Sequence, residues 1–325
     1  MNKPADWNGA LEALREAKVV ALACHVNPDG DALGALLGMS LALRKMGKTT
    51  HPTWGTPSAT VSRNYAFLPG ADSVVKPGSL GEVDLFIAVD CGDGSRLGSV
   101  EDAFKKAPRS INIDHHPGND DFATLNVVIT DASSTAEIAT RMLEDLGVEF
   151  DRDIATCLYT GIVTDTGRFQ YANSSPEVLR LAADLLAHGV PATAIAQEVF
   201  ESAPFGYLKL TGHVLERAKL LAEHSFVYSW FARKDLKDTN VSSEETEKLI
   251  DLVRSTRDAD IAGMFKEQSD GTYRVSLRSK GPRSVGAIAR ANGGGGHELA
   301  AGFTAKSVED AVKAVIEGLS AQVQD

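Results

Sequence analysis

The stretch VVALACHVNPDGD, residues 19–31, decides the fold. Its first five residues form a continuous apolar run, which is typical of a strand buried on both faces of a parallel sheet. Asn, Pro, Asp and Gly follow the run and indicate a loop, and residues 32–45 then show a helical pattern. The stretch therefore predicts a strand, a loop and a helix, the unit from which open α/β sheets are built.

The rest of the first half repeats this alternation. Short β-rich runs predict strands at residues 83–89 and 110–113, and helices are predicted at residues 133–146, 154–163 and 176–188. We expect residues 1–190 to form a doubly wound α/β domain with a mainly parallel sheet. A dinucleotide-binding Rossmann protein is disfavoured because no G-x-G-x-x-G pattern follows the first strand.

The pattern changes after Pro191. Residues 192–222 look helical, although Pro204 should interrupt the helix. Further strands are predicted at residues 226–231, 261–265 and 273–277, with helices at 244–254 and 309–319. We expect a smaller α+β domain over residues 223–325, joined to the first domain by a helical linker over residues 191–222.

Composition excludes several classes of protein. The chain has 325 residues, 43% hydrophobic and 24% charged, as in ordinary globular proteins. A net charge of −11 argues against a protein that coats DNA. The apolar runs are far shorter than the roughly 18 residues that a membrane span needs, and the first twenty residues lack a signal-like apolar core. Cys24, Cys91 and Cys157 lie in or beside apolar runs, as reduced cysteines do, so we expect a cytoplasmic protein.

A histidine and two aspartates follow the first strand: His25, Asp29 and Asp31. Either aspartate could cap the next helix, and the histidine could be an ordinary loop residue. Capping needs one oxygen acceptor, however, and explains neither the second carboxylate nor the histidine. Because ligands bind at the carboxyl ends of strands in open α/β sheets, this cluster favours metal binding.

Three more positions repeat the pattern. Asp90 ends a strand, Asp114-His115-His116 ends the next, and Asp165 ends an apolar helical run. Each could be a turn residue if taken alone. Oxygen and nitrogen ligands without thiolates suit Mn²⁺ or Mg²⁺, with Co²⁺ as another candidate. Two divalent cations would cancel the four candidate aspartates, and such a pair activates water and holds phosphoryl oxygens, which predicts a hydrolase of phosphate esters or anhydrides.

The late segment 293–297, GGGGH, indicates a phosphate site. A glycine run is most often a flexible linker, but this run precedes an apolar segment that we expect to be a helix. Glycines before a helix let backbone N–H groups approach an anion. Residues 271–300 contain five Lys and Arg against one Glu, a net charge of +4. We therefore interpret this segment as a phosphate clamp.

Together these motifs resemble the DHH phosphoesterase superfamily, most closely its bacterial nanoRNase and pAp-phosphatase branch. The resemblance rests on H-x-x-P-D-x-D-x-x-G at residues 25–34, Asp90, the Asp114-His115-His116 triplet, Asp165 and the GGGGH box. It implies a metal domain, a helical linker and a DHH-associated substrate domain, with the active site in the cleft between the domains. One departure is Ala35, where the family often has Ser.

The resemblance also implies residue roles. One Mn²⁺ would be held by His25, Asp29 and Asp90, and the other by Asp31, Asp90, His115 and Asp165. Asp114 would orient His115, and His116 would face the scissile phosphate. The nucleotide would be gripped by Arg278, Ser279, Gly294, Gly295, Gly296 and His297.

The implied reaction is hydrolysis of very short oligoribonucleotides to nucleoside monophosphates, and of pAp to AMP. Cyclic or linear dinucleotides remain alternative substrates. A family II pyrophosphatase shares the metal motifs but lacks the GGGGH box, and a RecJ-like exonuclease would need more positive charge. A non-catalytic nucleotide sensor would normally have lost ligands. The sequence leaves the oligomeric state open.

Overall fold

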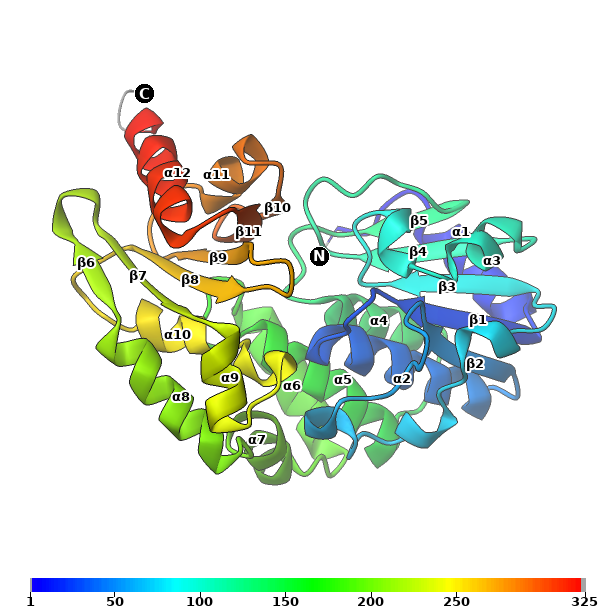
Figure 1. The fold of residues 1–325 in the computed structure, drawn as a ribbon. Coiled ribbons are helices and arrows are strands. Elements are labelled where there is room, and N and C mark those ends of the chain that lie inside the picture. Colours follow the sequence, from blue (N-terminus) through cyan, green and yellow to red (C-terminus); the bar gives the residue numbers. More distant parts are fainter. Residues whose placement is uncertain (1, 323–325) are drawn as a thin grey trace. The chain divides into compact units, whose positions relative to one another are not determined.

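The computed structural model describes residues 2–322, which divide into two compact units with the boundary between residues 202 and 203. The first unit contains a five-stranded sheet in the order β2-β1-β3-β4-β5, and every neighbouring pair is parallel (Figure 1). Its strands are β1 (Val19–Cys24), β2 (Thr49–Trp54), β3 (Leu85–Val89), β4 (Ser110–Asp114) and β5 (Leu125–Val128). Its helices are α1 (Trp7–Glu16), α2 (Gly30–Lys45), α3 (Glu101–Lys106), α4 (Thr135–Asp145), α5 (Arg152–Asp165), α6 (Pro176–Ala187) and α7 (Ala192–Phe200).

Helices cover both faces of this sheet. Leu22 and Ile87 pack into the large core that includes α2, α4 and α5, whereas Ala21 and Phe86 face a smaller core with Phe104 of α3. Each strand therefore contributes apolar side chains to both faces, which explains its continuous apolar run. The doubly wound α/β fold with a mainly parallel sheet is confirmed.

Helices α2 and α5 pack closely because glycines lie at their contact. A Cβ on Gly34 of α2 would come within 2.5 Å of the Cys157 carbonyl oxygen on α5. A Cβ on Gly161 of α5 would come within 2.4 Å of the Ala136 side chain on α4. The glycines therefore let α2, α4 and α5 pack closely together, and polar residues lie at the ends of these helices.

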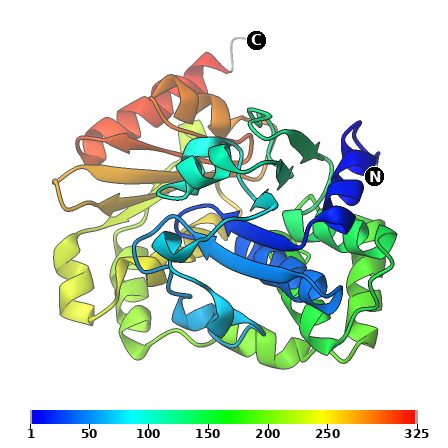
Figure 2. The same cartoon turned by 90° about the vertical axis from the view of Figure 1, so that its right-hand side faces the viewer.

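The second unit contains a six-stranded mixed sheet in the order β10-β11-β9-β8-β7-β6, in which only β7 and β8 are parallel. Figures 1 and 2 show α11 and α12 on one face and α8, α9 and α10 on the other. Its strands are β6 (Lys219–Leu221), β7 (Phe226–Phe231), β8 (Ile261–Glu267), β9 (Tyr273–Ser279), β10 (Gly295–His297) and β11 (Ala300–Ala305). Its helices are α8 (Phe205–Glu216), α9 (Arg233–Thr239), α10 (Leu249–Arg254), α11 (Val285–Ala291) and α12 (Val308–Ala321).

Two expectations need correction. The predicted helical span 192–222 is interrupted at Pro204, as expected, and gives α7 and α8, but its end is not helical because residues 219–221 form strand β6. The segment after the glycine run is not a helix, because Gly295–His297 and Ala300–Ala305 pair as antiparallel strands. The glycines therefore do not precede the N-terminus of a helix, and no helix dipole favours an anion beside them. Within the described residues, no single helix is long and apolar enough to cross a bilayer, and α6 with α7 pass that test only as a pair bent by 113°.

Candidate metal centre and phosphate site

The carboxyl end of β1 supplies His25. Its Nδ1 lies 2.9 Å from the Val26 carbonyl oxygen, which accepts a hydrogen bond when Nδ1 is protonated. A neutral ring in that tautomer leaves Nε2 as the free, metal-binding nitrogen. His25 Nε2 lies 3.5 Å from Asp90 Oδ2 and 4.0 Å from Asp29 Oδ2. His25 thus presents a ligand nitrogen to two carboxylates.

The two carboxylate oxygens of Asp29 make different contacts. Its Oδ1 accepts hydrogen bonds from the backbone nitrogens of Asp31 and Ala32, at 3.1 and 3.0 Å, so it is the N-cap of α2. Its Oδ2 is the oxygen that faces His25. Capping therefore does not compete with ligation, because each role uses a different oxygen.

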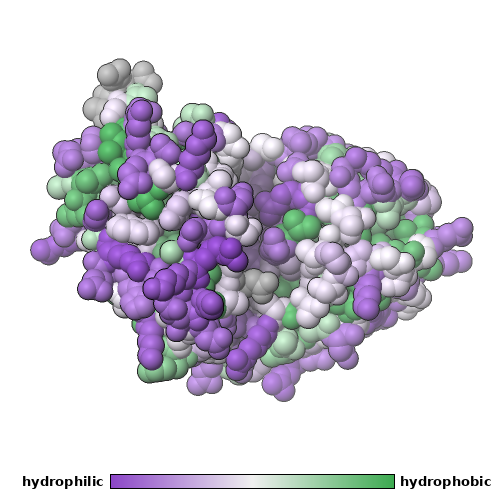
Figure 3. All heavy atoms as spheres, viewed as in Figure 1, coloured by the Kyte–Doolittle hydropathy of each residue, from purple (hydrophilic) through white to green (hydrophobic). Residues whose placement is uncertain are grey.

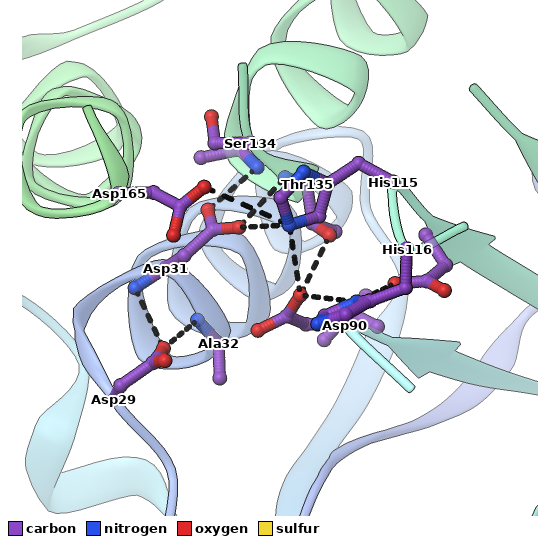
Figure 4. A network of polar contacts seen from close by, with 12 residues as sticks. Asp29, Asp31, Ala32, Asp90, His115, His116, Ser134, Thr135 and Asp165 are labelled. Carbon is purple, nitrogen blue, oxygen red and sulfur yellow. Dashed lines mark hydrogen bonds and ion pairs between the residues drawn. The ribbon is translucent and has the colours of Figure 1, made fainter. Parts of the chain in front are cut away.

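Asp31 lies buried in the first turn of α2. Its carboxylate accepts hydrogen bonds from the backbone nitrogens of Thr135 (2.7 Å) and Ala136 (2.9 Å), at the start of α4 (Figure 4). A helix N-terminus carries a partial positive charge and unpaired N–H groups, so α4 stabilises this anion and fixes its direction.

Asp90 lies at the centre of the cluster (Figure 4). It directly follows β3, and its φ of +59° is in the left-handed region, which aspartate tolerates better than most residues. Its Oδ1 accepts a hydrogen bond from Thr135 Oγ1 at 3.0 Å, and it lies 3.7 Å from His115 Nε2 and 3.6 Å from His116 Nδ1. With His25 at the other oxygen, the carboxylate is bordered by three imidazoles.

His115 brings two further carboxylates into the cluster. Its Nε2 lies 4.0 Å from Asp31 Oδ2 and 3.6 Å from Asp165 Oδ2. Asp165 is the last residue of α5, whereas His115 follows β4. Side chains from α2, α5 and two strand ends therefore meet within a few ångströms, as the sequence motifs predict.

Asp114 contacts a different histidine from the one that the family resemblance implies. Its Oδ1 lies 2.7 Å from His116 Nδ1, and its Oδ2 accepts a 2.6 Å hydrogen bond from Asn119 Nδ2. The side chain of Asp114 is fully buried, so its direction is fixed. The hydrogen bond orients the His116 ring and leaves its Nε2 to face outward from Asp114.

Burial and charge set the protonation of the cluster. Burial raises the pKa of Asp31, and the charges of Asp90 and Asp165 raise it further. Burial, with the charges of Asp29 and Asp90, raises the pKa of Asp165 to about 7 despite the opposing charge of His115. Crowded carboxylates with raised pKa values indicate a site that lacks positive charge.

Contacts with each other and with neighbouring groups shift the pKa values of Asp90 and His116 against the effect of burial. Burial alone would raise the pKa of Asp90, but the hydrogen bond with His25 and the charges of His116 and His115 lower it below its usual range. Burial alone would lower the pKa of His116, but the hydrogen bond with Asp114 and the charge of Asp90 raise it to about 9. His116 therefore carries a proton at neutral pH.

The residues fit a pair of divalent cations. Three groups made only of residues from the first unit have ligand atoms within 4.8 Å of one another: His25, Asp29 and Asp90; Asp31, Asp90 and His115; and Asp90, Asp114 and His116. Asp90 belongs to all three, as a bridging ligand must. The donors are carboxylate oxygens and imidazole nitrogens, the set that Mn²⁺ and similar ions accept.

Sequence reasoning missed the residues that hold the ligands in place. Thr135 and the backbone of Ala136 bind Asp31 and Asp90, and Asn119 binds Asp114. A signal for the first two exists: Ser134 and Glu137 have the spacing of a capping box and mark the start of α4. Nothing in the sequence shows that this helix start points at Asp31.

The residues proposed to bind substrate gather at one edge of the second unit's sheet. Ala300 of β11 pairs with Arg278 of β9 on one side and with His297 of β10 on the other. Ser279 is buried, and its backbone nitrogen donates to the Leu299 carbonyl at 2.8 Å. Arg278, Ser279 and His297 therefore lie in one small region, beside the glycines Gly294, Gly295 and Gly296.

Glycine is required within that region. A Cβ on Gly294 would come within 2.1 Å of the Gly302 carbonyl oxygen, and Gly296 has a φ of +127°. The run is thus part of a tight hairpin and not a flexible linker.

Comparison with known proteins agrees with this architecture. Residues 19–162 match the DHH family N-terminal domain, and residues 223–325 match the DHHA1 domain. The bifunctional oligoribonuclease and PAP phosphatase NrnA of Thermus thermophilus is 34% identical, over 89% of this chain and 85% of its own length. The Bacillus subtilis protein of the same name is 29% identical, over 88% of this chain and 89% of its own. An exopolyphosphatase-related protein from Bacteroides fragilis shares the fold, with a TM-score of 0.89, 24% identity and coverage of 97% and 96%. The chain therefore belongs to the DHH family, with a DHHA1 domain as its second part.

Proposed function

We propose that the protein is a phosphoesterase that hydrolyses very short oligoribonucleotides to nucleoside monophosphates and pAp to AMP, with two divalent cations, preferably Mn²⁺. The convergence of His25, Asp29, Asp31, Asp90, His115 and Asp165 at one edge of the parallel sheet is the observation that supports it most. Relatives named as oligoribonuclease and PAP phosphatase cover both domains of the chain, which supports the choice of substrate.

Six residues would hold the cations. His25, Asp29 and Asp90 would bind one, and Asp31, Asp90, His115 and Asp165 the other. When bound, the pair would lower the pKa of a water and neutralise the charge of the phosphoryl oxygens. Thr135 and the first turn of α4 would keep Asp31 and Asp90 aimed at the cations by holding their carboxylates.

His116 would act on the phosphate itself. Its Nδ1 is hydrogen-bonded to Asp114, which fixes the direction of the ring, and its Nε2–H would donate to a phosphoryl or leaving oxygen of the substrate. The raised pKa keeps that proton in place at neutral pH, which suits a hydrogen-bond donor or general acid.

The DHHA1 domain would bind the nucleotide. Arg278 offers a guanidinium that suits phosphate, and Ser279 and His297 offer further polar groups at the same edge of the sheet. The backbone of Gly294, Gly295 and Gly296 would approach the ligand closely, because no side chains intervene.

Product analysis tests the proposal. Purified protein with Mn²⁺ is given RNA dimers to pentamers, pAp, pyrophosphate and cyclic dinucleotides, and the products are separated. We expect mononucleotides from the RNAs and AMP from pAp. Turnover of pyrophosphate or cyclic dinucleotides alone would contradict the substrate assignment.

A variant tests the metal assignment in the same assay. Asp90→Asn should abolish turnover, because it removes the bridging charge. Asp93→Asn is the matched control, since Asp93 only caps a short turn on the same loop. Full activity of Asp90→Asn would contradict the ligand set.

A further inference from the structure

Helix α8 of the second unit has two opposite apolar faces. Leu210 and Val214 are fully buried in the core of that unit. Leu208 and Leu215 are 62% and 48% exposed, and Phe205 at the start of the helix is 72% exposed. At about 100° per residue, this second set lies on the side of the helix opposite Leu210 and Val214. The buried face packs α8 onto the core of its unit. The fold of one chain does not account for the apolar side chains on the exposed face.

The exposed side chains form one stripe. Phe205, Leu208, Gly212 and Leu215 are spaced by three, four and three residues, the spacing of a continuous helical seam. Figure 1 shows α8 at the outer side of its unit, and Figure 3 shows a surface of mixed hydropathy on that side of the molecule. Contiguous exposed apolar surface of this kind marks interaction sites more often than isolated exposed leucines do.

Strand β6 extends this surface. Leu220 is 46% exposed and pairs with Val227 of β7. Val227 belongs to the same core cluster as Leu210 of α8, so Leu220 lies on the face of the sheet that α8 covers. We call Phe205, Leu208, Leu215 and Leu220, with Gly212 between them, the α8 stripe.

The centre of the stripe permits close approach. Among the described residues, no heavy atom lies within 4 Å of a Cβ added at Gly212, so the backbone of α8 is accessible there. Leu208 and Leu215 lie at nearly equal distances along the helix on either side of Gly212. A second helix that crosses here can therefore come close to the backbone between two leucines.

The charged residues beside the stripe indicate which helix packs against it. Lys209 and Glu216 are exposed, seven residues apart, and therefore on the same side of the stripe. If two copies of α8 pack antiparallel about a two-fold axis near Gly212, the side of the helix that carries Lys209 and Glu216 lies next to the same side of the partner helix. The two chains run in opposite directions along this contact. Lys209 of each copy then faces Glu216 of the other, and Leu208 faces Leu215. A parallel arrangement would not form these pairs.

We propose that the α8 stripe is a homodimer interface in which two copies of this chain pack their α8 helices antiparallel across Gly212. The interface is isologous, because each stripe supplies both the apolar surface and both charges that the other needs. Lys209, whose Nζ lies 5.4 Å from the Phe205 ring centroid in the single chain, would turn toward the partner's Glu216.

Solution mass tests the proposal on the full chain. Sedimentation velocity over a range of protein concentrations should show a monomer–dimer equilibrium. Leu208→Glu should weaken dimerisation at least about tenfold, because it buries a charge against the partner's Leu215. Leu179→Glu is the matched control: Leu179 is 49% exposed but lies on α6, and its replacement should leave the equilibrium unchanged. A monomer at every concentration, or a dimer indifferent to Leu208→Glu, would overturn the proposal.

Charge exchange tests the direction of packing. Lys209→Glu and Glu216→Lys should each weaken the dimer, since each places like charges opposite one another twice. The double variant should restore it, because the pairs form again with reversed sign. Failure of the double variant to recover would overturn the antiparallel arrangement.

Cross-linking tests the register. All three native cysteines are buried, so an introduced cysteine reacts alone under mild oxidation. Gly212→Cys should give a covalent dimer, because Gly212 faces itself across the two-fold axis. Leu179→Cys should stay monomeric under the same conditions. Equal cross-linking of both variants would contradict the register.

Discussion

The hydrogen bond between Asp114 and His116 sets both the direction and the pKa of a histidine that lies beside several carboxylates. Asp114 is fully buried and is itself held by Asn119, so its carboxylate has a fixed direction. It binds Nδ1 of His116 and raises the pKa of that ring. The other ring nitrogen is then a proton donor over most of the physiological range.

Asp114→Asn should shift the pH dependence of the reaction. His116 must be protonated to donate, so activity is present below its pKa and is lost as the pH rises through it. The amide removes the charge that raises this pKa, so we expect the alkaline limb of kcat to move to lower pH. The measurement is a kcat–pH profile with saturating Mn²⁺. Asp93→Asn should keep the wild-type limb, and an unchanged limb in Asp114→Asn would show that His116 is not the titrating donor.

Thr135→Val should separate metal affinity from turnover. The hydroxyl of Thr135 donates to Asp90 Oδ1 at 3.0 Å, and valine keeps the shape but not the hydrogen bond. Loss of such a support typically weakens metal binding about 10–100-fold. We expect activity to need more Mn²⁺ but to recover at saturation, as read from activity against Mn²⁺ concentration. Thr140→Val, a buried threonine on the same helix whose hydroxyl binds the Ala136 carbonyl, should keep the wild-type curve.

At the scale of elements, the sequence predicts the strands that contain apolar runs and misses β2, which has none. Residues 19–23 and 85–89 are apolar because helices cover both faces of the sheet, and the apolar runs predict both strands. Strand β2 contains Pro52 and few apolar residues, and it lies at the sheet edge, where proline is tolerated. Nothing in the sequence of β2 itself indicates that it pairs with β1.

The glycine run shows the same limit in the second unit. The motif predicts that Gly294 and its neighbours lie beside a ligand, but the local pattern Glu-Leu-Ala-Ala indicated a helix. The segment is a strand because Ala300–Ala305 pairs with β9 along its whole length. Long-range pairing therefore outweighs helix propensity here.

Gly34→Ala should destabilise the first unit and its metal site together. The added Cβ would come within 2.5 Å of a backbone oxygen of α5, so α2 and α5 must separate. Overpacking of this kind costs about 1–3 kcal/mol. Since α2 carries Asp31 and α5 carries Asp165, we also expect weaker Mn²⁺ binding. Urea unfolding and Mn²⁺ titration measure the two effects.

Gly78→Ala is the matched control for that experiment, because a Cβ there meets nothing within 4 Å. It should leave both stability and Mn²⁺ affinity unchanged. If Gly34→Ala lowered stability without affecting Mn²⁺ affinity, the packing of α2 on α5 would not be what positions the two aspartates.

At the scale of the whole molecule, ligands that are far apart in the chain converge because the sheet is parallel. His25, Asp90 and His115 directly follow three adjacent strands, β1, β3 and β4, so topology alone places them at one edge. This part of the site follows from sequence reasoning. Asp165 reaches His115 only because α5 packs against α2. The hydrogen bonds from α4 to Asp31 depend on where the N-terminus of α4 lies in the fold. The local sequence pattern predicts neither of these.

The same convergence makes stability depend on pH and metal together. In the metal-free protein the pKa of Asp165 is raised to about 7, whereas an unfolded aspartate has a pKa of about 3.9. A raised folded pKa gives stability that is present below about pH 4 and is lost as the pH rises toward about 7. Cations bind the ionised carboxylates and therefore offset this loss most at high pH.

Chelation should accordingly lower the melting temperature more at pH 8 than at pH 5. Scanning calorimetry of the wild type with Mn²⁺ or with EDTA measures the difference at each pH. In Asp165→Asn the raised carboxyl pKa is absent, so the effect of EDTA should vary less with pH. An EDTA effect of equal size at both pH values in the wild type would mean that these buried carboxylates do not ionise on binding the cation, and the charge argument for the metal centre would not hold.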